Sequence, residues 1–354
     1  MYPRIEIHLG EIKYNAHAVT RMCKEKNIKV MGITKGVCAL PEVVRAMTDG
    51  GVADLGDARL KNIADIKKAG FSLPVYLIRI PMMSEVPELV RIAGGSLNSE
   101  VSVIRAISSE AVKAGKTHNV ILMVDVGDLR EGVMPEDAVK TAGEVLDLPG
   151  VRLEGIGTNL GCYGGVIATG ENTGCLAGLA KDIERRYGIK LATISGGNSE
   201  TLQLMREGGL ARGVNQLRVG EAILLGTDST YVSPIPGLEQ DTMILKTEVI
   251  ESKTKPSVPI GEIGKNSFGE VPVFEDKGDM RRAIVAIGKQ DCHIEGLTPL
   301  DERMKIIGAS SDHMILDVTS VGDVKPGDII GFKVTYSAML SLMTSNYVYK
   351  KFID

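Results

Sequence analysis

The stretch Ile28–Leu40, IKVMGITKGVCAL, decides the fold that we predict for this chain. Its first part is apolar except for Lys29, which is typical of a strand buried in a parallel sheet. Lys35 follows where that strand should end. Desolvation at such a position lowers the pKa of an amine and makes it a usable nucleophile. The alternative is an exposed lysine that only caps the strand.

The same pattern of short apolar strand, turn and amphipathic helix recurs along the chain. Strands are predicted at residues 4–8, 28–34, 52–55, 74–79, 96–98, 119–125, 151–157, 191–195 and 214–218. Helices are predicted at 11–26, 58–69, 101–114, 135–146, 174–187 and 200–207. Strand–helix alternation predicts parallel strands with right-handed crossovers. Eight such units after the first strand predict an α/β fold, a closed (β/α)8 TIM barrel.

The pattern changes after Tyr231, where the turn-rich segment SPIPG begins at Ser233. Short apolar runs follow at 242–250, 282–287, 304–307, 314–318 and 329–334, separated by Gly, Pro, Asp and Lys. This pattern is typical of a mostly antiparallel β domain. We therefore predict a barrel over residues 9–232 and a C-terminal β domain over 233–354.

Composition excludes several classes of function. The chain has 354 residues and a net charge of −4, without a basic stripe for nucleic acid. Five scattered cysteines without CxxC spacing indicate reduced thiols and a cytoplasmic location. There is neither a signal-peptide core nor an apolar run that could span a membrane. Five dispersed histidines, without HxH or HxxxH pairs, make a histidine-built metal site unexpected.

Polar residues and glycines follow four further barrel strands. They lie in VDVGDLREG (124–132), GIGTN (155–159), SGGNS (195–199) and LRVGE (217–221). Functional groups of a barrel gather at the C-terminal ends of its strands. The planar fork of Arg130 suits a carboxylate. A glycine-rich turn that opens a helix suits a phosphate.

In this order, the motifs resemble the alanine-racemase-like, fold-type III enzymes that use pyridoxal 5′-phosphate (PLP). The resemblance implies that residues 1–8 join the β domain and that Lys35 binds the cofactor covalently. It also implies that Arg130 binds the carboxylate of a small amino-acid substrate. The expected assembly is a homodimer, in which the β domain of one subunit completes the active site of the other.

The resemblance also implies the other cofactor contacts. These residues are Asn159, Ser199, Arg218, Gly220, Glu221 and Tyr349. Arg218 would meet the pyridine nitrogen, while Ser199, Tyr349 and the N–H groups of Gly220 and Glu221 would bind the phosphate. Because arginine has no proton to give at neutral pH, it leaves that nitrogen unprotonated and favours return of a proton to Cα over other reactions.

Four departures from the family pattern argue against alanine racemase itself, and one of them is GDLREG (127–132) in place of GMxRxG. Met123 replaces a lysine that is often carbamylated, and Asn159 replaces a histidine. Lys289 stands where the family has a tyrosine as the second base. The candidates for that base are Asp291, which we favour, then Lys289, followed by Cys292 and His293.

The motifs are most similar to the ornithine racemase branch of the family. A substrate with a distal ammonium requires a carboxylate partner. The acidic candidates are Asp128, Glu131, Asp228 and Asp291, and Tyr336 could add a phenol. Two alternatives remain: a D-amino-acid aldolase or dehydratase that also holds a metal, for which Asp291 and His293 are conceivable ligands, and a non-catalytic PLP-binding protein.

Overall fold

The computed structural model describes residues 1–230 and 233–354, which form two compact units. One unit is Leu9–Gln240, and the other combines Met1–His8 with Asp241–Asp354. The predicted boundary after residue 232 falls on a residue outside the description, so it stays a prediction. Residues 233–240 group with the barrel because β11 (Ser233–Pro234) pairs with β10 (Thr227–Asp228).

The first unit contains a closed barrel of eight parallel strands, as the sequence predicted. The strands are β2 (Lys29–Ile33), β3 (Asp54–Asp57), β4 (Val75–Leu77), β5 (Gly95–Asn98), β6 (His118–Met123), β7 (Val151–Gly157), β8 (Thr193–Ser195) and β9 (Gln216–Val219). The barrel closes where β2 pairs in parallel with β9, from Lys29 beside Gln216 to Gly32 beside Val219. This closure brings the end of β2, and with it Lys35, next to the end of β9.

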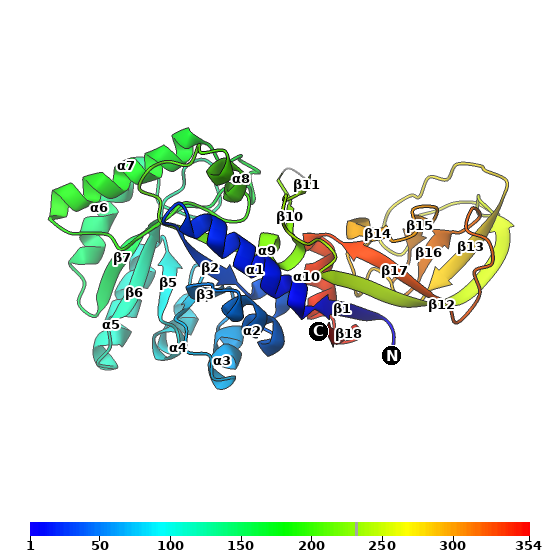
Figure 1. The fold of residues 1–354 in the computed structure, drawn as a ribbon, viewed down its shortest axis with the longest axis horizontal. Helices are drawn as coiled ribbons and strands as arrows, with labels where there is room; N and C mark the ends of the chain where they lie inside the picture. Colours follow the sequence, from blue (N-terminus) through cyan, green and yellow to red (C-terminus); the bar gives the residue numbers. More distant parts are fainter. Residues whose placement is uncertain (231–232) are drawn as a thin grey trace. The chain divides into compact units, whose positions relative to one another are not determined.

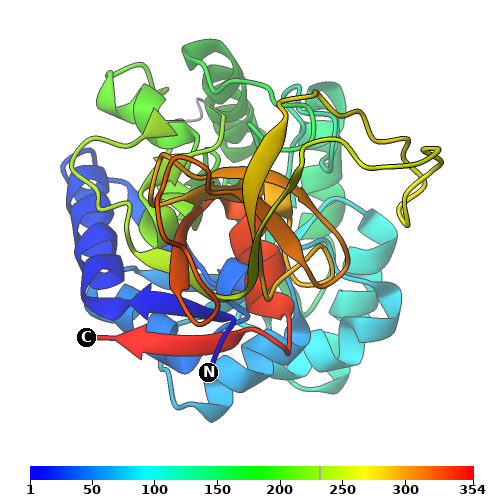
Figure 2. The same ribbon diagram turned by 90° about the vertical axis from the view of Figure 1, so that its right-hand side faces the viewer.

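Helices lie around the outside of this barrel (Figures 1 and 2). They are α1 (Leu9–Lys24), α2 (Pro41–Asp49), α3 (Leu60–Lys68), α4 (Val86–Ile92), α5 (Val101–Lys113), α6 (Pro135–Leu146), α7 (Gly170–Tyr187), α8 (Thr201–Arg206) and α9 (Glu221–Leu225). Two short 3-10 turns are η1 (Lys35–Val37) and η2 (Met83–Glu85). The six predicted helices are confirmed, with ends that differ by a few residues.

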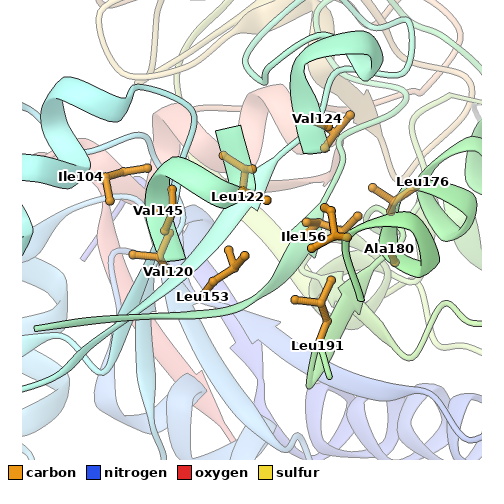
Figure 3. Close-up of a cluster of buried hydrophobic side chains, with 13 residues drawn as sticks. Ile104, Val120, Leu122, Val124, Val145, Leu153, Ile156, Leu176, Ala180 and Leu191 are labelled. Carbon is orange, nitrogen blue, oxygen red and sulfur yellow. The ribbon is translucent and has the colours of Figure 1, made fainter. Parts of the chain in front are cut away.

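Apolar packing fixes the strands that carry the candidate site. Inside the barrel, Met31, Ile33, Tyr76, Leu97, Ile121 and Met123 form one cluster. A second cluster joins β6 and β7 to α5, α6 and α7, and includes Leu122, Ile156 and Leu176 (Figure 3). Each such buried aliphatic side chain contributes about 1.5–3 kcal/mol through the hydrophobic effect. This packing makes the ends of β6 and β7 rigid supports for the loops beyond them.

The second unit is mainly antiparallel. Its elements are β1 (Arg4–His8), β12 (Met243–Pro256), β13 (Asp279–Val285), η3 (Ile294–Gly296), β14 (Leu297–Pro299), β15 (Lys305–Ala309), β16 (Met314–Asp317), β17 (Ile329–Val334), α10 (Tyr336–Thr344) and β18 (Tyr349–Ile353). β1 pairs antiparallel with β12 and parallel with β18, which lies beside it in Figure 2. The expectation that residues 1–8 join this sheet is confirmed.

Two elements near the C-terminus, α10 and β18, were not predicted from the sequence. The apolar run of α10 buries Ala338, Met339, Leu342 and Met343, whereas β18 is half-exposed and is held by pairing with β1. Within the described part of the chain, no helix is long and apolar enough to cross a membrane.

Candidate active site

Lys35 lies two residues past the end of β2, after Thr34, as the first residue of the 3-10 turn η1. Its side chain reaches solvent at the barrel mouth, yet the surrounding protein desolvates the ammonium enough to lower its pKa. Cys162 and Glu200 oppose this effect, and Arg130 and Arg218 reinforce it. Arg130, Cys162 and Glu200 lie in the loops after β6, β7 and β8, and Arg218 lies in β9, so the barrel gathers all four around one amine.

The loop after β6 carries Arg130 and is closed on itself. The Asp125 Oδ1 atom accepts hydrogen bonds from the N–H groups of Gly127, at 2.9 Å, and Leu129, at 3.1 Å. Val133 pairs back with Val124. Gly132 has a φ of +142°, and a Cβ there would lie 2.4 Å from the Asp125 nitrogen, so only glycine fits this turn.

Arg130 and Glu131 form a two-point ion pair within this loop. The Arg130 Nη2 atom donates to Glu131 Oε1 at 2.5 Å, and Nε donates to Oε2. Hydrogen bonding to Glu131 is the main cause of the raised pKa of Arg130. The Arg130 side chain is 37% exposed, so its charge remains accessible from the barrel mouth.

Arg218, in β9, is buried among neutral acceptors. Its Nη1 donates to Ser195 Oγ at 2.6 Å, and its Nη2 donates to the Thr158 carbonyl at 2.6 Å and to Asn159 Oδ1 at 2.5 Å. Burial lowers the pKa of Arg218 to about 10, which still leaves it charged at neutral pH. Asn159 also donates to Glu131 Oε1 at 2.6 Å, so a continuous chain of hydrogen bonds joins the two arginines.

The turn after β8 and the residues that follow β9 meet where Ser199 bonds to Ala222. Ser199 is 3% exposed, and its Oγ accepts a hydrogen bond from the Ala222 N–H at 3.2 Å. Among the described residues, no acceptor bonds the N–H groups of Gly220 and Glu221. The carboxylate of Glu221 accepts hydrogen bonds from the hydroxyl groups of Thr227 and Ser229. Free N–H groups beside a buried hydroxyl suit an anion.

Sequence reasoning missed two titratable neighbours of Lys35. Glu200 is 9% exposed, its Oε2 has no partner among the described residues, and burial raises its pKa to about 8. Cys162 accepts a hydrogen bond from Asn198 Nδ2 at 3.3 Å, and burial raises the pKa of its thiol. Their position in the sequence could have revealed them, because Glu200 directly follows the predicted site residue Ser199 and Cys162 lies three residues after the predicted site residue Asn159.

Asp128, predicted to contact the substrate, has different partners in the structure. It is 2% exposed, and its two oxygens accept from the N–H groups of Cys162, Tyr163 and Val166 at 3.0–3.4 Å. These contacts tie the loop after β7 to the loop after β6. The structure therefore favours loop anchoring over the substrate contact that the sequence predicted, because the carboxylate is already engaged.

Two further barrel residues are also buried. Met123 is fully buried in the barrel interior and supplies no charge to Arg130. Asp228 is 2% exposed, and its Oδ1 accepts a hydrogen bond from the Thr230 N–H at 2.9 Å.

Among the described residues, no group of three His, Cys, Asp or Glu side chains is arranged to hold a metal ion.

The remaining predicted residues belong to the other compact unit. Asp291 is 9% exposed and accepts from Ser345 Oγ at 2.6 Å. Lys289 lies over the ring of Phe268, 4.5 Å from its centroid, and 3.6 Å from Glu270. These contacts all lie within the β domain.

The other candidates in the β domain differ in exposure. Cys292 is buried, which raises the pKa of its thiol to about 12 and makes it a poor base at neutral pH. His293 is largely exposed, with its Nε2 3.6 Å from Glu295. Tyr336 is the partly buried first residue of α10, and Tyr349 is the exposed first residue of β18.

Comparison with known proteins identifies the family. The model of the alanine racemase N-terminal domain matches residues 7–228. The chain is 41% identical over 350 residues to a lysine racemase of Thermotoga maritima, covering 99% of this chain and 98% of that protein. It is 40% identical over 355 residues to an ornithine racemase of Acetoanaerobium sticklandii, covering 100% of both.

A solved structure extends the likeness of fold to the whole chain. An alanine racemase of Clostridium difficile has a TM-score of 0.78 at 20% identity, with 100% of this chain and 96% of that chain covered. At this identity the likeness concerns the fold, a barrel followed by an antiparallel β domain. The family model and the two relatives show that this chain belongs to the alanine racemase family, defined by the alanine racemase N-terminal domain.

Proposed function

We propose that this chain is a PLP-dependent racemase of basic amino acids, an isomerase whose favoured substrate is ornithine. The observation that carries the proposal is the gathering of Arg130, Arg218, Cys162 and Glu200 around the desolvated Lys35. Two full-length relatives at 40–41% identity, named for ornithine and lysine, support a basic substrate.

The residues of the barrel mouth fit the cofactor. The partnerless N–H groups of Gly220 and Glu221, beside Ser199, suit its phosphate. Lys35 would hold it covalently, Arg218 would meet its ring nitrogen, and Asn159 would lie beside the ring. Tyr349 stays the further phosphate candidate that the family resemblance implies. When bound, PLP acts as the electron sink that acidifies the Cα–H bond of an amino acid.

The side chains of the barrel then divide the remaining work. Lys35, whose pKa is lowered by desolvation, is the general base and acid that moves a proton at one face of Cα. Arg130 binds the substrate carboxylate and orients Cα toward Lys35. Arg218 keeps a positive charge without a proton to donate at neutral pH, which favours return of the proton to Cα.

The second face of Cα requires a second proton carrier. We place Asp291 in this role, with Lys289 as the next candidate, and assign both to a second copy of the chain in a homodimer. Tyr336 would then lie near the substrate. The hydrogen bond from Ser345 fixes the carboxylate of Asp291, and Phe268 with Glu270 fixes the amine of Lys289. All five cysteines are free, in keeping with a cytoplasmic enzyme.

Substrate choice is tested by comparing L-ornithine, L-lysine and L-alanine with the PLP-loaded protein. Chiral chromatography measures formation of each D-enantiomer. We expect kcat/KM to be highest for ornithine, and at least about tenfold lower for alanine, since alanine lacks a distal ammonium. Equal turnover of alanine and ornithine would contradict the assignment to basic amino acids.

A further inference from the structure

Glu131 occupies one of the two bidentate edges of the Arg130 guanidinium. That edge is formed by Nε and Nη2, and both atoms donate to the carboxylate of Glu131. Among the residues that the structure describes, none accepts a hydrogen bond from Nη1 of Arg130. The second edge, formed by Nη1 and Nη2, therefore stays available to one further planar anion.

Glu131 also acts on the second arginine. The amide of Asn159 donates to Glu131 and accepts from Arg218 Nη2 at 2.5 Å. The direct partners of Arg218 are all neutral, because they are a hydroxyl, a carbonyl and this amide. The negative charge of Glu131 favours the charged form of Arg218, and the charge of Arg130 opposes it. The carboxylate of Glu131 thus interacts directly with Arg130 and, through Asn159, with Arg218.

The loop geometry holds Glu131 in place. Asp125 fixes the turn through its bonds to Gly127 and Leu129, and Gly132 closes that turn where no larger residue fits. The Glu131 side chain is 16% exposed, against 37% for Arg130, so the acid lies inside and the arginine outside. A partly exposed ion pair contributes little to folding stability. Orientation of Arg130 is what this pair supplies.

We propose that Glu131 is a positioning residue rather than a substrate contact. It holds Arg130 by one edge so that the other edge receives the substrate carboxylate, and through Asn159 it orients Arg218. This role replaces the predicted contact between Glu131 and a distal ammonium. It rests on the proposed function, because the anion at the free edge is taken to be an amino-acid carboxylate.

The test compares two ligands that differ by that carboxylate, racemic ornithine and 1,4-diaminobutane. Their Kd values are measured by calorimetry on the PLP-loaded wild type, Glu131→Gln, Glu131→Asp and the control Glu136→Gln. Glu136 is an exposed residue in the first turn of α6. Racemic ornithine keeps its composition during turnover. Thermal unfolding verifies that each variant folds, and turnover of L-ornithine is measured separately.

We expect Glu131→Gln to raise the Kd of ornithine about 10-fold or more and that of 1,4-diaminobutane by less than about 3-fold, since only ornithine uses the oriented edge. Glu131→Asp should restore part of the affinity, and Glu136→Gln should match the wild type. Turnover should fall through KM more than through kcat.

Two results would overturn the role of Glu131. The first is an unchanged Kd for ornithine in Glu131→Gln, and the second is an equal loss for both ligands, which would indicate contact with the distal ammonium. Equal affinity of the wild type for both ligands would overturn it as well. A wild type that prefers ornithine but racemises no amino acid would instead refute the proposed function and leave the role of Glu131 standing.

Discussion

Arg130 and Arg218 carry the same side chain in opposite surroundings. Arg130 lies in the loop after β6 with its side chain 37% exposed, pairs with a carboxylate and has a raised pKa. Arg218 lies in a barrel strand, is 4% exposed, bonds to neutral acceptors and has a lowered pKa. An arginine with one free edge can bind a ligand through that edge. A buried arginine with fixed partners acts on a ligand only through its positive charge. At this site the arginine that is paired with a carboxylate, Arg130, stays accessible to a ligand. The arginine without an ionic partner, Arg218, is buried and held in one position.

The largest expected effect follows replacement of the buried arginine. Arg218→Gln leaves acceptors on Ser195, Thr158 and Asn159 without their charged donor. We expect the free energy of unfolding in urea to fall by about 3–5 kcal/mol. Racemisation should also be lost. Arg212→Gln, at an exposed position, serves as the control, and an equal effect of the two substitutions would contradict the account.

Glu200 extends the comparison to a buried acid whose Oε2 has no hydrogen-bond partner among the described residues. Its pKa rises from 4.5 to about 8 through burial, so the folded state binds more protons than the unfolded state between these pH values. Stability of the cofactor-free wild type should therefore fall as pH rises through this window. Relative to the wild type, Glu200→Gln should gain stability from pH 5 to pH 9, by up to about 4 kcal/mol. A difference independent of pH would contradict the raised pKa.

Arg130→Lys tests the paired side of the comparison. Lysine keeps the charge but lacks the planar fork, so it cannot bond Glu131 by one edge and a carboxylate by the other. We expect the Kd of ornithine to rise about 10- to 100-fold. Unfolding should change by less than about 1 kcal/mol, because the pair is partly exposed. Unaltered affinity in calorimetry would show that Arg130 is not the carboxylate site.

The smallest effect is expected at Asp128, which separates loop anchoring from substrate binding. Asp128→Ala removes the acceptor for three backbone N–H groups and should cost about 1–2 kcal/mol of unfolding free energy. The KM for ornithine should change by less than about threefold, because the carboxylate is engaged elsewhere. A large rise in KM with unchanged stability would restore the predicted substrate contact.

Residues that a barrel strand positions could be located from the sequence alone. The eight barrel strands are short and mostly buried, and the residues just past them, such as Lys35, Asn159 and Ser199, follow from where each strand must end. For the second unit the sequence predicted a mostly antiparallel β domain. Helix α10 was missed, because the residues that it buries are defined by packing within the folded domain.

Pairing within the site could not be predicted in the same way. Asp128 bonds to N–H groups 34–38 residues further along the chain, a contact that no local pattern encodes. Glu131 and Arg130 are neighbours in sequence, and neighbouring residues face each other only when a turn brings them together, as the bonds of Asp125 do here. The isolation of Glu200 depends on burial, which needs the whole fold.

In the proposed function, Lys35 moves a proton at Cα of a basic amino acid. The most direct measurement is incubation of the PLP-loaded protein with L-ornithine in deuterated water, with chiral chromatography for D-ornithine and mass spectrometry for deuterium at Cα. We predict D-ornithine carrying deuterium at Cα, abolished in Lys35→Ala. Deuterium uptake without inversion, or D-ornithine formed equally well by Lys35→Ala, would contradict the account.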